Sequence, residues 1–587
     1  MAAKIAGEVS AQQGLGKVSA GQVSFYKELI GFIMEKKPDK GSISKKKMAL
    51  CKKHGLEKIP TDIEVLLNAD AKDIRKIKRY LLTKPGRTLS GVAVIAIMSY
   101  PYPCPHGECI MCPSNTGKGV PQSYTGKEPA ARRGIRNEFD PYLQVMNRLE
   151  QYIASGHHPA KAELIIMGGT FPSFDQGYQE DFVKFAFKAM NDFSSIFYDR
   201  DGSIDIVAFR KFFELPGDIG LEDRTQRIQK KLLEMKLKPR KKGAIRLESE
   251  QAANEKSVVR CVGLTIETRP DYCRLMHCNE MLRLGCTRVE LGVQTVYDHV
   301  LEDIGRRHSV QDSIDATRTL KDLGFKINYH MMPGLPGVTK EMDMSSLKRI
   351  FDDSSFRPDM LKIYPCMVLK GTRLFDEWEK GKFSPLSTKK AAVLIAEFKR
   401  YVPEYVRIMR VQRDIPSNMI TAGVDRTNLR QYIDRLNHGC RCIRCREAGH
   451  VYKTKGLRPG KVDIIVREYD ASSGKEFFIS VEDKEQDILL GFCRLRLPGQ
   501  TLRPEITKAS ALVRELHVYG DLAEFGKKAK GHDIQHRGYG KRLLKKAEAI
   551  AKENSKKKVV VISGVGVRDY YRKQGYRREG PYMVKSI

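Results

Sequence analysis

The chain has 587 residues and a mass of 66.7 kDa, more than one hydrophobic core usually organises, so at least two domains are expected. Charged residues make up 30% and hydrophobic residues 41%, which is typical of globular proteins, and no stretch approaches the roughly 20 apolar residues of a membrane span. The formal net charge of +33 exceeds what solubility requires and favours a polyanionic partner, nucleic acid before an acidic membrane surface.

The cysteine content and the distribution of basic residues bear on the cellular compartment and on the partner. The first residues lack the apolar segment of a secretory signal, and the thirteen cysteines show no spacing of a disulfide framework. Reduced thiols or metal ligands, and a cytoplasmic location without membrane attachment, are therefore expected. Basic residues concentrate in segments 35–58, 73–87 and 228–242. Each alone could be a solvated helix face, but three together favour binding to nucleic acid.

Residues 1–88 form a basic region with weak helical periodicity, and residues 89–410 follow an alternating pattern. Short apolar runs suited to buried parallel strands are each followed by a helical stretch. This predicts a partial barrel or open sheet of six βα units, with a charged helical insertion at about 189–256. The six runs lie at residues 91–101, 161–171, 258–270, 287–295, 326–337 and 360–369.

The pattern changes again after residue 410. Residues 411–460 form a polar linker that contains several cysteines, and residues 461–587 form a second α/β domain. In this domain antiparallel-looking strands precede one amphipathic helix and a further strand. The predicted strands are 462–469, 475–483, 488–497, 511–520 and 557–566, and the helix is 540–554.

Three cysteines follow the first predicted strand within nine residues: Cys104, Cys109 and Cys112. Reactive groups gather at the carboxyl ends of strands in α/β folds. Three thiolates can hold three irons of a 4Fe-4S cluster and leave the fourth iron open to a chelating ligand. A structural zinc, with His106 as the fourth ligand, is the alternative for this loop.

Later strands end in residues suited to the same rim. Gly168, Gly169 and Thr170 would let backbone approach a ligand, although a tight turn is the simpler interpretation. Glu267 and Gln294 end the third and fourth strands. The ordered series of cysteine loop, GGT, IETRP, LGVQT and PGLPG resembles the radical S-adenosylmethionine superfamily, although that superfamily usually places three, not four, residues between its first two cysteines. The resemblance implies that the GGT residues face the methionine amino group of S-adenosylmethionine and that Glu267 and Gln294 line its adenosyl part.

The C-terminal sequence "IQHRGYGKRLLKKAE" places a glycine-rich turn at the start of the predicted helix. Backbone N–H groups there suit a pyrophosphate, because they converge with the positive end of the helix dipole. With the flanking strands, this segment resembles the GNAT acetyltransferases. The resemblance implies acetyl-CoA as ligand, with Tyr571 or its neighbour Tyr570 beside the thioester as a proton donor. It further implies that Glu515, Leu516, His517 and Val518 lie along the pantetheine, and Gln535, Gly538, Tyr539, Gly540 and Lys541 at the pyrophosphate.

The two patterns in one chain, together with "QSYTGKEP", "KIYPCMVLKGT" and "GPYMVK", resemble the catalytic subunit of Elongator, a family of tRNA-modifying enzymes. The resemblance implies formation of 5-carboxymethyluridine at the wobble position of tRNA. A radical derived from S-adenosylmethionine would remove a methyl hydrogen of acetyl-CoA, and the carbon radical would add to the uracil. It also implies an acetyl-CoA contact at Lys161, which could otherwise be a surface lysine.

Further hypotheses stand beside the predicted tRNA modification. Cys440, Cys442 and Cys445 lie close enough in sequence to share a zinc, with His438, His450 or Cys366 as conceivable fourth ligands, or to remain unliganded thiols. The rival functions are a protein lysine acetyltransferase, possibly acting on histones, with a structural iron-sulfur domain, and a tRNA-binding scaffold. Expected partners are tRNA, acetyl-CoA and either other Elongator-like subunits or a second copy of the chain.

Overall fold

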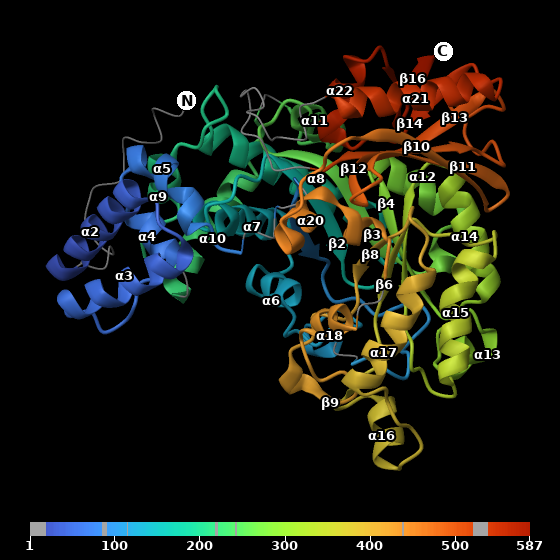
Figure 1. Cartoon of the computed structure of the whole chain (residues 1–587), viewed down its shortest axis with the longest axis horizontal. Helices are drawn as coiled ribbons and strands as arrows, with labels where there is room; N and C mark the ends of the chain where they lie inside the picture. Colours follow the sequence, from blue (N-terminus) through green and yellow to red (C-terminus); the bar gives the residue numbers. More distant parts are fainter. Residues whose placement is uncertain are drawn as a thin grey trace.

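The computed structural model describes residues 19–84, 88, 91–113, 116–217, 221–240, 243–436, 439–519 and 538–587. At the N-terminus a small bundle of helices lies to one side of the rest (Figure 1). Its first helix begins at Ser19, whose side chain accepts from the backbone of Gln22 in a capping box, and buries Phe25, Leu29 and Ile33 at four-residue spacing. The helices are α2 (Ala20–Lys36), α3 (Lys40–Lys53), α4 (Asp62–Asn68) and α5 (Ala71–Leu81).

The centre of the molecule is a sheet of seven parallel strands that form a partial barrel. Each of the six predicted apolar runs contains one of these strands. The seventh, β8, falls at the predicted domain end and has the sequence RIMR, in which polar ends and four residues give no strand signal. In sheet order the strands are β1 (Ala93–Met98), β2 (Lys161–Met167), β3 (Arg260–Thr268), β4 (Arg288–Gln294), β5 (Lys326–Met331), β6 (Met360–Ile363) and β8 (Arg407–Arg410).

Helices cover the outer face of this sheet. The expected helical insertion is present, but its expected start at residue 189 is wrong, because α8 (Gln176–Phe197) runs through that point without a break. Its apolar spacing, including Phe193 and Phe197, continues to the end of the helix. The remaining elements are α6 (Pro129–Arg136), α7 (Pro141–Ala154), α9 (Ile206–Phe212), α10 (Glu222–Lys236), α11 (Leu247–Asn254), α12 (Leu275–Leu284), α13 (Asp298–Asp303), α14 (Val310–Asp322), α15 (Lys340–Asp352), β7 (Val368–Leu369), α16 (Arg373–Glu379), α17 (Thr388–Phe398), β9 (Ile420–Ala422), α18 (Leu429–Arg435), α19 (Ile443–Arg446) and α20 (Ala448–Lys455).

The C-terminal sheet also has seven strands, in the order β10-β11-β12-β13-β14-β16-β15. All predicted strands and the predicted helix are present, and the hairpin of β15 and β16 adds two strands. The fold class is thus confirmed. The elements are β10 (Asp463–Ala471), β11 (Gly474–Asp483), β12 (Ile488–Leu497), β13 (Ser510–Val518), α21 (Tyr539–Glu553), β14 (Lys558–Val561), α22 (Arg568–Arg572), β15 (Arg577–Glu579) and β16 (Tyr582–Ser586).

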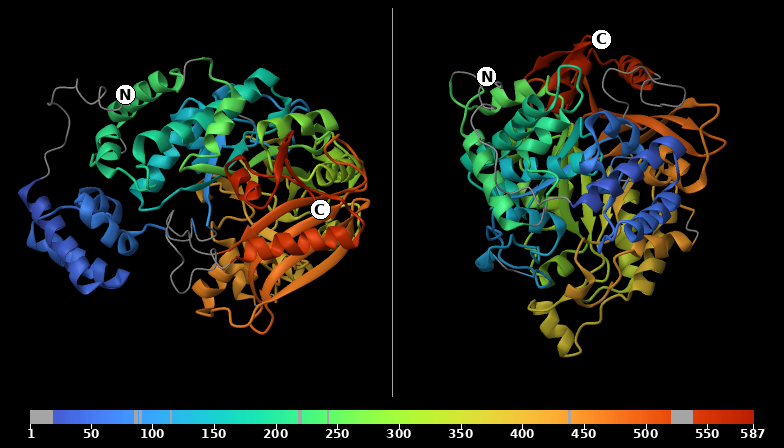
Figure 2. Two further views of the ribbon diagram at one scale, coloured as in Figure 1. Left: turned by 90° about the horizontal axis from the view of Figure 1, so that it is seen from above. Right: turned by 90° about the vertical axis from the view of Figure 1, so that its left-hand side faces the viewer.

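The C-terminal sheet lies across the amino-terminal ends of the barrel strands (Figures 1 and 2). Its outer face packs on α21, and buried residues of its inner face, such as Phe492 and Leu512, belong to the same apolar core as the barrel. The two sheets therefore form one packed body. The cysteine loop lies at the opposite, carboxyl-terminal end of the barrel strands.

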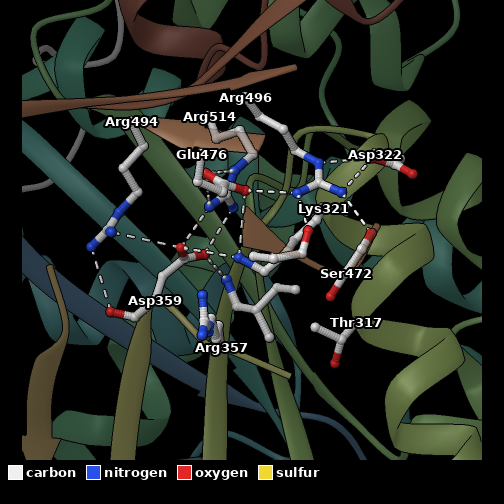
Figure 3. Close-up of polar contacts among 12 residues, drawn as sticks. Thr317, Lys321, Asp322, Arg357, Asp359, Ser472, Glu476, Arg494, Arg496 and Arg514 are labelled. Atoms are coloured by element: carbon white, nitrogen blue, oxygen red, sulfur yellow. Dashed lines mark hydrogen bonds and ion pairs between the residues drawn. The ribbon is translucent and has the colours of Figure 1, made fainter. Parts of the chain in front are cut away.

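Charged side chains with no solvent exposure join the two sheets (Figure 3). Arg514 of β13 donates to both carboxylate oxygens of Asp359, the residue before β6, over 2.8 and 2.6 Å. Glu476 of β11 accepts from Arg514 at 2.9 Å and from Arg496 at 3.1 Å. Lys321 of α14 lies 3.7 Å from Asp359 and 3.5 Å from Glu476. The network holds β13 against the barrel, and each of these buried charges has a partner of opposite charge.

No helix among the described residues is long and apolar enough to cross a bilayer.

Candidate functional site

The three cysteines of the loop line one cavity of about 300 Å³ at the carboxyl ends of the barrel strands, as predicted. The loop is held in place by Gln122, which accepts from the backbone of Cys104 and donates to Gly107 O at 3.0 Å. Ser123 N donates to Cys112 Sγ at 3.2 Å, and Arg306 Nη1 lies 3.8 Å from Cys109 Sγ. A backbone N–H and a guanidinium thus face two of the three sulfur atoms, whereas burial raises the pKa of the third thiol, Cys104, to about 11.

The spacing of these thiols distinguishes between the two predicted ligands, a 4Fe-4S cluster and a zinc ion. A tetrahedral zinc with Zn–S bonds of about 2.3 Å needs its sulfurs about 3.8 Å apart. Within the described residues, Cys104, Cys109 and Cys112 do not form a group with all ligand atoms inside 4.8 Å, whereas Cys440, Cys442 and Cys445 do. His106 Nε2 lies 3.2 Å from Cys109 Sγ, but within the described residues no group of three ligand atoms inside 4.8 Å includes His106 and these cysteines. The loop fits a larger cluster better than a single zinc ion.

The GGT segment lies beside this loop. Gly168 has φ of 126°, and a Cβ there would come within 2.2 Å of Ser99 Oγ, so another residue would not fit. Gly169 has φ of 101° and faces Cys104, whose Sγ would be 3.6 Å from an added Cβ. Gly169 and Thr170 line the cavity with the cysteines. The two glycines thus bring backbone next to the proposed cluster.

Glu267 and Gln294 also line this cavity, as predicted. Tyr124 donates to Glu267 at 2.9 Å. Gln294 adopts φ of 71°, and its buried Oε1 has no hydrogen-bond partner among the described residues, which suits a bound donor. Sequence reasoning missed Tyr124 and the arginine Arg306, whose guanidinium donates to Gly292 O at 2.8 Å.

Deeper in the barrel the cavity is lined by a chain of buried charged residues that sequence reasoning did not single out. Lys362 of β6 pairs with Glu290 of β4 and lies 3.6 Å from Glu267. Glu290 also accepts from His330 at 3.0 Å. Burial would lower the pKa of Lys362, but the Glu290 carboxylate outweighs it and raises that pKa. Charged residues inside apolar strands such as "TRVELGV" were the available signal.

A second cavity, of about 310 Å³, lies between the amino ends of the barrel strands and β13. It exists because β13 and β14 pair only from Ser510 to Val513 and then separate. The residues beyond the last pair, Glu515–Val518, line the cavity together with Lys161 and Tyr571. The structure therefore brings together the six residues predicted along the pantetheine and acetyl group.

The second cavity is lined by both neutral and charged groups. Burial lowers the pKa of His517 to about 4, so its ring is neutral at pH 7, and its Nε2 has no partner among the described residues. Burial raises the pKa of the Tyr571 phenol well above its usual value. Burial would raise the pKa of Glu515, but Lys326 and Arg494 lower it. Burial also lowers the pKa of Lys161.

The predicted pyrophosphate turn is only partly described, because Gln535 lies outside the described residues. Gly538 has φ of 77° and precedes the first turn of α21, and Lys541 is exposed there. A Cβ at Gly540 would approach Tyr570 Oη to 2.9 Å, so a larger residue there would displace the partly exposed tyrosine ring. The Tyr539 side chain, in contrast, is buried in the core between α21 and the sheet, so its backbone alone faces the turn. Tyr570 is 36% exposed and lies at this turn rather than among the cavity-lining residues described.

The second cysteine group joins the two sheets at α19, where Cys442 Sγ lies 3.7 Å from Cys445 Sγ. Ile443 N in the same turn donates to Val406 O, just before β8, at 2.9 Å. Of the conceivable fourth ligands, His438 lies outside the described residues. Cys366 packs in a separate apolar cluster with Cys109, and neither it nor His450 belongs to the group of ligand atoms within 4.8 Å.

Comparisons with known proteins agree with this architecture. The model of the radical SAM superfamily matches residues 220–350, that of the Radical_SAM C-terminal domain residues 358–437, and that of the acetyltransferase (GNAT) family residues 451–576. The tRNA uridine(34) acetyltransferase of Methanocaldococcus jannaschii is 45% identical over 538 residues, 90% of each chain. Human Elongator complex protein 3 is 36% identical over 559 residues, 93% of each chain.

A solved structure, the archaeal Elp3 of Methanocaldococcus infernus with an N-terminal deletion, aligns with a TM-score of 0.68 at 41% identity, covering 85% of this chain and 100% of that chain. The fold and its two cavities define a radical SAM enzyme fused to a GNAT acetyltransferase. The chain belongs to the family of Elongator complex protein 3 and the archaeal tRNA uridine(34) acetyltransferases.

Proposed function

We propose that this chain modifies the wobble uridine of tRNA to 5-carboxymethyluridine, with acetyl-CoA as the carbon source and S-adenosylmethionine as co-substrate. The observation that carries the proposal is that the cysteine-lined cavity and the acetyltransferase cavity are two ends of one barrel interior and share lining residues. A reaction that joins radical chemistry to a thioester needs such proximity. Relatives named tRNA uridine(34) acetyltransferase support the substrate.

At the first end, Cys104, Cys109 and Cys112 would hold a 4Fe-4S cluster. When bound and reduced, this cluster supplies the electron for cleavage of S-adenosylmethionine. Gly169 leaves backbone exposed beside the cysteines for the methionine part of the co-substrate, Thr170 lines the same surface, and the buried Gly168 would shape the turn that precedes them. Glu267 and Gln294, whose amide oxygen has no hydrogen-bond partner among the described residues, would bind the adenosyl part.

At the second end, the open edge of β13 would hydrogen-bond the pantetheine arm, because its backbone from Glu515 onward no longer pairs with β14. Lys161 would contact the acyl end. Tyr571, whose raised pKa keeps the phenol protonated, would donate a proton to the departing thiolate sulfur. The backbone at Gly538 and Gly540, with Lys541, would bind the pyrophosphate at the start of α21.

The basic N-terminal helices are proposed to bind tRNA phosphates. In α5 and the basic last turn of α3, lysines and arginines are exposed on one bundle. The uridine must leave the anticodon stack to reach a buried radical site, so recognition of a single-stranded loop is expected.

None of the thirteen cysteines, all within the described part of the chain, forms a disulfide, which supports a reducing, cytoplasmic location. Other subunits or a second copy would complete the assembly.

We further propose that Cys440, Cys442 and Cys445 hold a structural zinc ion. Their thiols cluster within 4.8 Å of one another, as one tetrahedral ion requires. Metal analysis of protein freed of iron should find about one zinc per chain, and the zinc should disappear in Cys442→Ser while Cys109→Ser retains it. Equal zinc in Cys442→Ser and the unaltered protein would contradict this proposal.

The rival function is lysine acetylation with a structural iron-sulfur domain. Cys109→Ser separates the two, because it removes one proposed cluster ligand at the end of the barrel remote from the acetyl-CoA cavity. We expect acetyl-CoA binding to persist and anaerobic uridine modification, measured by mass analysis of tRNA nucleosides, to vanish. Retained uridine modification in cluster-free Cys109→Ser, or acetylation of lysine alone by the unaltered enzyme, would refute the proposed function.

A further inference from the structure

The boundary between the two cavities lies in the middle of the barrel and consists of few residues. Both cavities are lined by Val94 of β1, Glu163 of β2, Arg288 of β4 and Met409 of β8. Val94 and Met409 are apolar, whereas Glu163 Oε1 and Arg288 Nη1 form an ion pair at 2.6 Å. The Arg288 side chain is 4% exposed. A group that extends from one cavity toward the other must therefore meet this ion pair.

Arg288 retains hydrogen-bond donors that its own surroundings do not use. Its Nε and Nη2 are buried and make no hydrogen bond to any described residue. Glu290 Oε1 lies 3.5 Å from Nη2, an ion-pair distance that leaves the N–H without a hydrogen-bond partner. Nε and Nη2 lie on one edge of the planar guanidinium and can bind acyl oxygen lone pairs. Buried donors without partners are rare, so they indicate a ligand.

Arg288 lines the acetyltransferase cavity as well as the cysteine cavity, and this indicates which ligand could reach it. Glu515 and His517, on the open end of β13 that is proposed to bind pantetheine, line the same cavity as Arg288. Glu515, with Glu163 and Glu290, also acts against burial and raises the pKa of Arg288. The acyl group continues the pantetheine arm beyond its sulfur. An acyl carbonyl oxygen is thus the acceptor that a CoA thioester would carry toward the barrel interior.

We propose that Arg288 binds the carbonyl oxygen of the acetyl group through its Nε–Nη2 edge and so positions that group at the boundary of the two cavities. This inference rests on the proposed function, which places acetyl-CoA in the second cavity. Glu163 keeps its bond to Nη1, so the guanidinium remains neutralised while its other edge binds the ligand. A charge-assisted hydrogen bond in a buried site discriminates strongly against a ligand without the oxygen.

The test compares acetyl-CoA with S-ethyl-CoA, which has the same length but no carbonyl oxygen. Equilibrium binding to full-length, cluster-free protein makes the result independent of catalysis. The unaltered protein should bind acetyl-CoA about tenfold more tightly than S-ethyl-CoA. Arg288→Met should bind both ligands equally, with its affinity for S-ethyl-CoA unchanged. Should Arg288→Met fold poorly, Arg288→Lys, which keeps the charge but not the planar edge, should also lose most of the preference.

Two further variants separate ligand binding from a structural role. Glu163→Gln should retain the preference, because the Nε–Nη2 edge of Arg288 remains, whereas a purely structural ion pair would make it behave like Arg288→Met. Arg577→Met removes an exposed cation of β15 that is not among the described lining residues of either cavity, and should leave both affinities unchanged. A preserved tenfold preference in Arg288→Met, or an equal loss for both ligands, would overturn the inference. Failure of the unaltered protein to bind either ligand would refute the acetyl-CoA site itself.

Discussion

Buried charged residues distinguish this protein at the residue scale. Asp343, at the start of α15, is 5% exposed, and its Oδ2 accepts from Gly334 N at 2.8 Å. Burial raises its pKa from 3.8 to about 7, although the hydrogen bond from Gly334 N acts in the opposite direction. The carboxyl group therefore binds its proton more tightly in the folded chain than in the unfolded chain.

Asp343 therefore makes the free energy of unfolding depend on pH. The contribution of Asp343 to stability is fully present below about pH 4 and is lost as pH rises toward 7. We expect Asp343→Asn to be more stable than the unaltered protein at pH 8, by about 4 kcal/mol at most, and to lose this advantage at pH 4. Urea unfolding of both proteins at pH 4 and pH 8 measures this difference in stability. The exposed Asp376→Asn serves as control, and an equal effect at both pH values would contradict the assignment.

Single residues also show what the sequence could and could not predict. The cysteines, GGT residues, Glu267 and Gln294 were predicted together because parallel strands end at one edge, and the structure places all of them around one cavity except the buried Gly168, which packs against Ser99. Arg288 and Glu163 were not predicted, because an arginine and a glutamate on strands separated in sequence by over a hundred residues carry no local signal of their pairing. Such a contact arises only from the register of β2, β3 and β4.

At the scale of elements, strand periodicity predicted the two sheets well. Apolar runs predicted six barrel strands, and alternating runs predicted β10 to β13. Two errors have local causes. The strand β8 is too short and polar to recognise, and α8 continues through the expected start of the insertion since its apolar spacing does not change there.

The buried network at β13 is the element-scale feature with the clearest energetic consequence. Arg514→Met would remove the cation that hydrogen-bonds both fully buried carboxylates, Asp359 and Glu476, and leave only the more distant Lys321 shared between them. Removal of one partner from a buried ion pair costs about 3–5 kcal/mol. Chemical unfolding should therefore show a large loss of stability in Arg514→Met.

Arg577→Met is the matched control, because Arg577 pairs with Glu579 at 2.9 Å on the surface, where its side chain is 80% exposed. Exposed ion pairs contribute little to stability. If Arg514→Met and Arg577→Met unfolded at the same denaturant concentration, the buried network would not stabilise the contact between the sheets.

At the scale of the whole molecule, the two sheets form one body with two adjoining cavities inside the barrel. One cavity is lined by the cysteines, Gly169 and Thr170, the other by the end of β13, Lys161 and Tyr571, and the Arg288–Glu163 pair lines both. The sequence predicted both sites but not that the C-terminal sheet would cover the amino ends of the barrel strands. That arrangement depends on long-range contacts such as Arg514 with Asp359.

The most direct measurement supplies the cluster-loaded enzyme with tRNA, S-adenosylmethionine, a reductant and acetyl-CoA labelled with ¹³C at both acetyl carbons, without oxygen. We predict a wobble uridine that carries both labelled carbons, and none when Cys109→Ser replaces the unaltered enzyme. Labelled acetyl groups on lysine with an unlabelled uridine, or equal labelling of uridine by Cys109→Ser, would contradict the account.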